Sequence, residues 1–223
     1  MAALVVALAG CSGSSGAADG GEASSSPAVG AAAKQASGDP AGDAPTGAEV
    51  LGVVAMGKPF TVTVIATNTA DDPNRWKFTV DSMICGKPLD PAVMADAAES
   101  VGAPTPTPIP ESGKQFCVLT MTAVNIGHNE ATWDADNTVS LNVGDTHYSE
   151  SQVDADYAMD YAQYWQSKGK VAPAFGLNPG SQGPVHGVFE IPAGDKPTSL
   201  WVTSGTAIKT IDGTQPGYLV QLK

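Results

Sequence analysis

The sequence predicts an antiparallel β-sandwich of seven to nine strands that follows a long polar N-terminal segment. Residues 58–67, 75–85 and 115–125 alternate apolar and polar side chains with the period of two that is typical of β-strands. Similar short segments recur toward the C-terminus, and turn-forming residues separate them. Because these strands follow one another with few helical segments between them, the pattern favours a sandwich over βαβ units.

Two of these segments indicate which side chains form the core. The segment 115–125 is rather apolar on both faces, which predicts a central strand covered on both sides. Trp76 and Trp133 are expected in the core. The expected faces are Trp76, Phe78, Val80 and Ser82 along 75–85, Cys117, Leu119, Met121 and Ala123 along 115–125, and, opposite these, Phe116, Val118, Thr120, Thr122 and Val124.

Turn signals and two irregular segments divide the rest of the chain. Gly144-Asp145 predicts a tight hairpin turn. A short helix is expected at 92–99, before a run of alternating prolines that disfavours both helix and central strand. A second helix is expected within 154–168, capped by Asp154 or Asp156. Further strands are predicted at 131–133, 139–143, 146–148, 187–191, 199–204 and 218–222.

The first eleven residues form a short apolar run that ends in Leu8-Ala9-Gly10-Cys11. The run is too short to span a bilayer, which takes about 20 apolar residues. It fits the end of a secretory signal, and the last four residues match a bacterial lipobox. No Lys or Arg precedes Cys11, so we expect a start further upstream or a clipped signal. The sequence predicts lipidation of Cys11 and anchoring to the outer face of the cytoplasmic membrane; the alternative is a chance apolar N-terminus.

Residues 12–48 consist almost entirely of Ser, Gly, Ala, Asp and Pro, and Val29 is their only large aliphatic side chain. Such a segment buries too little apolar surface to offset its ordering entropy. It therefore predicts a disordered tether with a reach of roughly 35 Å. A single domain is expected over 49–223.

Charge and cysteine count restrict the partners and the compartment. The net charge of −12, with 11 Lys and Arg, argues against nucleic acid, which requires clustered basic residues. If Cys11 carries lipid, Cys85 and Cys117 remain as a pair, and an exported domain sits where disulfides persist. We predict a Cys85–Cys117 disulfide; the alternative is two free buried thiols.

The sequence offers little catalytic or metal-binding chemistry. His128, His147 and His186 lack metal-ligand spacing, and there is no Gly-x-Ser-x-Gly motif. Asp134-Ala135-Asp136-Asn137 alternates oxygen ligands faintly like a calcium loop, but the loop glycine and the distant glutamate are missing, so a solvated loop is favoured. We predict no enzymatic activity, no cofactor and no metal.

Four aromatic residues stand out as a candidate partner-binding site: Tyr157, Tyr161, Tyr164 and Trp165. They fall near one stripe of the predicted helix, and Tyr and Trp are enriched at binding surfaces. Three neighbouring aspartates at 154, 156 and 160 would suit a cationic partner. The alternative is that the stripe packs over an open end of the sandwich.

Three segments together carry a family resemblance: 114–127, 177–180 and 187–198. They resemble the lipoproteins of high-GC Gram-positive bacteria that carry an immunoglobulin-like domain of unknown function, which are similar to secreted mycobacterial immunoprotective antigens. The resemblance covers about 50–222 and implies an immunoglobulin-like sandwich with a cysteine pair matching Cys85 and Cys117. It implies no enzymatic activity and transfers no site residues, and the proline-rich and aromatic segments depart from it.

Two functions follow as hypotheses. The first is a non-catalytic, surface-tethered module that binds an envelope component or an extracellular ligand. The second is a solute-binding or sensing lipoprotein that serves a transporter or a signalling system. A concave cavity with a few polar groups would favour the second, whereas an exposed aromatic patch would favour the first.

Overall fold

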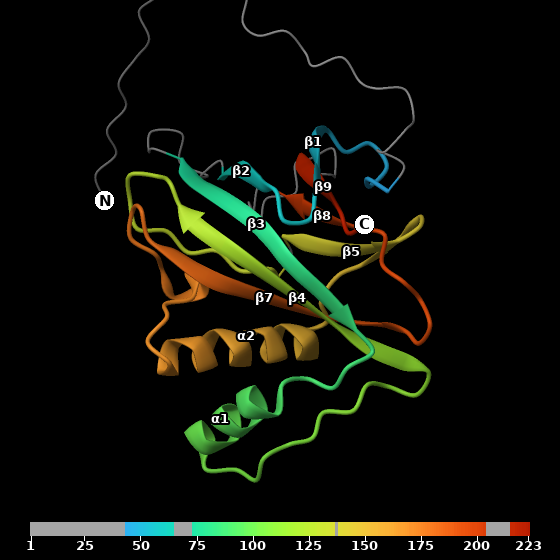
Figure 1. Cartoon of the computed structure of the whole chain (residues 1–223), viewed down its shortest axis with the longest axis vertical. Coiled ribbons are helices and arrows are strands. Elements are labelled where there is room, and N and C mark those ends of the chain that lie inside the picture. The colour runs from blue at the N-terminus through green and yellow to red at the C-terminus, as the bar shows by residue number, and fades with distance from the viewer. Residues whose placement is uncertain (1–42, 65–72, 137, 204–214) are drawn as a thin grey trace, which may run out of the picture. The chain divides into compact units, whose positions relative to one another are not determined.

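Nine strands of the described residues form two sheets that pack face to face (Figure 1). The computed structural model describes residues 43–64, 73–136, 138–203 and 215–223. Cys11 and most of the predicted tether lie outside them. The predicted β-sandwich of seven to nine strands is confirmed.

The first sheet contains four strands, all antiparallel. Its order is β2-β3-β4-β7, so β4 is a central strand, as predicted, and β7 lies at an edge. Along β4, the side chains of Cys117, Leu119, Met121 and Ala123 are wholly buried between the sheets. The strands are β2 (Pro59–Val64), β3 (Asn74–Cys85), β4 (Lys114–Asn125) and β7 (Gln182–Pro192).

The second sheet contains five strands in the order β1-β9-β8-β5-β6. β1 pairs with β9 in parallel, which is the one exception to the predicted antiparallel arrangement among the described strands. The Gly144-Asp145 hairpin is confirmed, and it joins β5 to β6. The strands are β1 (Val50–Ala55), β5 (Val139–Val143), β6 (Thr146–Tyr148), β8 (Ser199–Thr203) and β9 (Gly217–Gln221).

The core between the sheets contains both tryptophans predicted there. Trp76 is 0% and Trp133 is 4% exposed. Trp76, Phe78 and Val80 of β3 face the core, as predicted. The pairing of β3 with β4 shifts register between Val80 and Ser82. This bulge adds a residue and reverses the alternation. Met83, rather than the predicted Ser82, therefore packs against the core.

Three strand predictions are wrong in detail. β1 was not predicted at all; half of its side chains are exposed, so its sequence lacks a clear apolar face. The segment 131–133 is not a strand, because Ala131 makes only an isolated bridge with Leu177. β7 begins five residues earlier than the predicted strand at 187–191, since Gly183 and Pro184 weaken the strand pattern.

Two helices, α1 (Pro91–Val101) and α2 (Gln152–Ser167), form a layer on the outer face of the four-stranded sheet (Figure 1). α2 lies against β7, and α1 packs on α2. A second apolar cluster fills the space between helices and sheet. Its buried members are Leu89, Val93, Met94, Phe116, Tyr161 and Val188.

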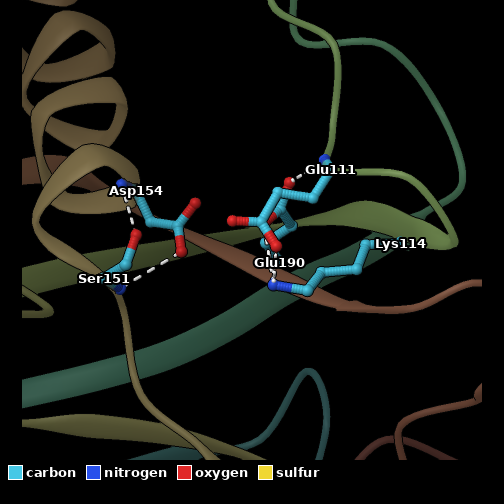
Figure 2. A network of polar contacts seen from close by, with 5 residues as sticks. All are labelled: Glu111, Lys114, Ser151, Asp154 and Glu190. Atoms are coloured by element: carbon cyan, nitrogen blue, oxygen red, sulfur yellow. Dashed lines mark hydrogen bonds and ion pairs between the residues drawn. The ribbon is translucent and has the colours of Figure 1, made fainter.

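The start of α2 differs from the prediction. The N-cap is Ser151, and Asp154 is the third helical residue (Figure 2). The Ser151 hydroxyl accepts from the Asp154 amide at 3.2 Å, and the Asp154 carboxylate accepts from the Ser151 amide at 3.1 Å. This capping box satisfies two helix-end donors at once, so the helix begins before either predicted cap.

The folded domain also begins earlier than the predicted boundary at residue 49. The Asp43 carboxylate accepts hydrogen bonds from the hydroxyls of Thr198 and Ser199, at 2.7 and 2.9 Å. The buried side-chain amide of Asn142 donates to the Asp43 carbonyl at 3.0 Å. The last residues assigned to the tether are therefore bound to β5 and β8.

The predicted disulfide is present: Cys85 ends β3 and Cys117 lies directly opposite it in β4. The two cysteines are 32 residues apart, and the bridge closes the segment that contains α1.

Replacing both cysteines (Cys85→Ser/Cys117→Ser) should lower the free energy of unfolding by about 3–4 kcal/mol, because the bridge restricts the unfolded chain. Urea denaturation of the oxidised protein and of the double variant measures this difference. Two thiols that react with an alkylating reagent in the native, unreduced protein would contradict the bridge.

Candidate functional site: a carboxylate-lined cavity at the edge of β7

The free edge of β7 requires hydrogen-bond partners, and acidic side chains at the start of α2 supply them. The Val188 amide donates to Glu150 Oε1 at 2.6 Å. Two residues along, the Glu190 amide faces the Asp154 carboxyl, where it opposes the rise in the pKa of Asp154 that burial causes. Because backbone groups in an antiparallel strand alternate between its two neighbours, those of His186 turn to the same edge.

Next to this edge lies a cavity of about 210 Å³. β7 forms one wall and α2 forms another, and the chain from Trp133 to Asp136 closes a third side together with the short helix Pro173–Phe175. The apolar lining comes largely from small side chains. These are Ala135, Ala155, Ala158, Ala162, Ala172, Pro173, Ala174, Pro184 and Val185, with Met159 and Trp133.

Three polar atoms of cavity-lining residues are buried without a hydrogen-bond partner: Glu150 Oε2, His186 Nδ1 and Trp133 Nε1. Buried polar groups in folded proteins almost always have partners, so such atoms call for an explanation. The indole nitrogens of Trp76 and Trp201, which do not line the cavity, are unpartnered as well. The carboxylate and the imidazole therefore carry the evidence for a ligand.

Burial raises the pKa of Glu150 from its ordinary value of 4.5 to about 8. The hydrogen bond from the Val188 amide opposes this shift, whereas the nearby charges of Asp136, Asp154 and Asp134 add to it. Glu150 is consequently mostly protonated at neutral pH in the empty cavity.

Burial also lowers the pKa of His186, to about 4. The imidazole stacks on Tyr161, with ring centroids 4.7 Å apart, and lies parallel to Trp165 at 6.4 Å. His186 is therefore neutral at physiological pH, and one ring nitrogen is available as a hydrogen-bond acceptor.

Three further acidic residues line the cavity: Asp134, Asp136 and Asp156. Burial, and then the charge of Asp136, raises the pKa of Asp134. No Lys or Arg is among the described lining residues. In the described part of the chain, no three His, Cys, Asp or Glu side chains are arranged to hold a metal ion. Asp134 and Asp136 therefore do not belong to such a cluster.

The lysines on nearby elements are engaged elsewhere. Lys114 pairs with Glu111 at 2.6 Å and with Glu190 at 3.3 Å (Figure 2). Lys168 pairs with Asp96 at 3.4 Å, and Lys170 lies 4.4 Å above the Trp165 ring. Among the described residues, none of these three lysines forms an ion pair with a carboxyl group that lines the cavity.

The aromatic stripe of α2 packs largely against the protein. Tyr161 is 7% exposed, and its hydroxyl accepts from the Asp90 amide at 3.0 Å. Tyr157 and Tyr164 are half-buried against the second apolar cluster, and Trp165 is half-buried beside His186. The stripe covers the outer face of the sheet rather than an open end of the sandwich, and partner binding through these residues stays a prediction.

Sequence reasoning did not predict the cavity, and it favoured a solvated loop for 134–137, where Asp134 and Asp136 are indeed exposed. It noted Asp134 and Asp136 as oxygen ligands and Asp156 as a feature that would suit a cationic partner, and the structure brings these residues to one cavity. It missed Glu150 and His186. Glu150 lies just before the cap of α2, and this was the only available signal, because its burial depends on the β7 edge.

The geometry defines a β-sandwich domain with a small acidic cavity under a helix. No family model matches this chain, and no curated protein matches it. Three solved structures are similar. MPT63, a secreted protein of Mycobacterium tuberculosis, is 12% identical with a TM-score of 0.41, over 77% of this chain and 95% of that one.

An uncharacterized β-sandwich protein of Clostridium difficile is 15% identical with a TM-score of 0.41, over 78% of this chain and 96% of that one. A conserved hypothetical protein of Bacillus anthracis is 17% identical with a TM-score of 0.37, over 65% of this chain and 90% of that one. None of these likenesses transfers an activity or a site.

Glu150 should make the protein lose stability as the pH rises. Its pKa is raised on folding, so its stabilising contribution is complete below about 4.5 and is lost as the pH rises through about 8. Between about pH 5 and pH 8, the free energy of unfolding of Glu150→Gln should fall less than that of the wild type, by on the order of 2 kcal/mol. Chemical denaturation at the two pH values measures this.

His186 titrates in the opposite sense, because its lowered pKa stabilises the fold above about 6.5 and that contribution is lost toward about 4. This contribution is common to wild type and variant and cancels in their comparison. Exposed Glu99 provides the control substitution Glu99→Gln, which should follow the wild-type profile. Parallel profiles for wild type and Glu150→Gln would contradict the buried state of this carboxyl group.

Proposed function

We propose that this protein is a lipid-anchored cell-surface protein whose β-sandwich binds a small solute in the cavity between α2 and β7, in the service of a transporter or a signalling system. The observation that carries the proposal is the cavity itself, with Glu150 Oε2 and His186 Nδ1 buried beside it without partners. Ligand sites commonly combine apolar walls with a few convergent polar groups.

The alternative, a module that binds an envelope protein through the aromatic residues of α2, has less support. Binding through Tyr161 would require the ring to leave the second apolar cluster, where it contacts the helix layer and the sheet. Anchors at protein interfaces are exposed before binding and buried afterwards. Of the four aromatic residues, Tyr161 is buried within this chain and the other three are half-buried.

The anchor part of the proposal is based on Leu8-Ala9-Gly10-Cys11 and on the Cys85–Cys117 disulfide, which suits an oxidising compartment outside the cytoplasm. Among the described residues, no helix is long and apolar enough to cross a membrane.

Cells given radioactive palmitate should label the wild-type protein, and Cys11→Ser should lose the label and leave the membrane fraction. Cys85→Ser is the matched control and should keep the label, because its thiol lies in the folded domain. Label that persists in Cys11→Ser would contradict the anchor.

The solute-binding part is tested by filling the cavity. Ala155→Leu adds three carbon atoms in the first turn of α2, on the cavity wall. Compounds that raise the melting temperature of the wild type, drawn from a library of molecules of up to about ten non-hydrogen atoms, should lose this effect in Ala155→Leu. Native mass spectrometry checks the stoichiometry of binding.

Ala92→Leu is the control, because Ala92 is exposed on α1 and does not line the cavity. It should retain every response of the wild type. A library in which no compound binds, or binding that Ala155→Leu does not weaken, would contradict solute binding at this cavity.

A further inference from the structure

We infer that the solute is a small organic cation, a short aliphatic chain that bears a protonated primary amine, with its ammonium group at Glu150 Oε2. This inference rests on the proposed function and adds the chemical class of the ligand. It follows from the charge, the hydrogen-bonding capacity, the size and the walls of the cavity.

The charge of the lining favours a cation. Glu150 contributes one largely buried carboxyl group, and solvent-exposed Asp134, Asp136 and Asp156 contribute three more. The described lining residues include no Lys or Arg to bind an anion. Burial first, and then the charge of Asp136, raises the pKa of Asp134. A cation among these carboxyl groups relieves the repulsion between them, whereas an anion would increase it.

The unpartnered atoms favour an ammonium group as the form of that cation. Deprotonated Glu150 presents Oε2 as an acceptor, while its Oε1 is held by the Val188 amide. Neutral His186 presents a second acceptor. A primary ammonium group has three donors and no acceptor, which suits these two acceptors. The Trp133 indole N–H on the same lining is a donor, and such a ligand would leave it unpartnered.

The size and the walls favour a short hydrocarbon chain. A volume of about 210 Å³ lies below the roughly 300–1,000 Å³ that is common for drug-sized ligands, so it suits a small molecule. Ala155, Ala158 and Ala162 lie at spacings of three and four residues on α2, so their methyl groups face the same side. A bare metal ion would leave these apolar walls without contact, and no cluster of described side chains is arranged to hold one.

The experiment compares n-butylammonium, n-butanol and butyrate, which share a four-carbon chain and differ in charge. Each is titrated into the full-length chain carrying Cys11→Ser, at about pH 8.5, where Glu150 is largely ionised. Chemical shifts of the backbone amides of Val188 and Asp136 report binding at the cavity. Butylammonium should bind at least about tenfold more tightly than butanol, and butyrate should not saturate.

Two variants locate the ammonium group. Glu150→Gln keeps an acceptor for the Val188 amide but removes the charge, so it should weaken butylammonium at least about tenfold and change butanol by less than about threefold. Glu99→Gln removes a charge of the same kind on exposed α1 and should change neither.

The pH dependence gives an independent readout. The groups that face Glu150 are the carboxyls of Asp134, Asp136 and Asp154 and the Val188 amide, with His186 neutral throughout the range. Ammonium binding requires ionised Glu150, so affinity should rise about tenfold per pH unit below about 8 and then level off. Glu150→Gln should flatten this rise.

The outcomes separate the inference from the function on which it rests. Tighter binding of butanol or butyrate at Val188 and Asp136, or butylammonium binding that Glu150→Gln leaves unchanged, overturns the cation and leaves a solute-binding cavity. If none of the three compounds causes a saturable change in the amide chemical shifts of Val188 and Asp136, the inference of a cationic ligand is also overturned. If the wider library likewise finds no compound sensitive to Ala155→Leu, the proposed function fails as well.

Discussion

The free edge of β7 is the constraint on which the candidate site depends. An edge strand exposes backbone amides that must be covered or paired. Here α2 lies along that edge, and the glutamate just before its cap accepts the Val188 amide. This contact holds the Glu150 carboxyl group in a largely buried position. Oε1 accepts the hydrogen bond, and Oε2 has no hydrogen-bond partner. The cavity, the raised pKa of Glu150 and the unpartnered oxygen all follow from the way in which this edge is closed.

The same constraint explains why the aromatic residues of α2 face inward. α2 also packs on the outer face of the sheet through the second apolar cluster. Tyr161 fills the space between α1, α2 and β7, and His186 stacks on its ring. The residues that resemble a recognition surface in the sequence therefore hold the helix in place, and the small residues of α2 line the cavity.

The fold was largely predictable because its main strands are periodic and their faces are separated by polarity. β4 was recognised by the opposite feature, because both of its faces are rather apolar, and both pack against apolar clusters. The Cys85–Cys117 pair also followed from cysteine count and compartment. The errors have local causes: one inserted residue after Val80 reverses a face, and a serine cap moves the start of α2. β1 was missed because its exposed positions, such as Leu51 and Val53, are also apolar, so the sequence shows no alternation.

The candidate site was less predictable, because its chemistry arises from burial and not from residue type. Glu150 and His186 are common residues with no motif around them, and they are 36 positions apart in the chain. Both acquire shifted pKa values mainly through burial, so each is largely neutral at physiological pH without a ligand. A neutral carboxyl in an empty cavity costs the fold less than an unpaired buried charge would. Entry of a cation would reverse that preference, because the cation supplies a counter-charge for the ionised carboxylate. The neighbouring lysines do not supply it, since they contact Glu111, Glu190, Asp96 and the Trp165 ring.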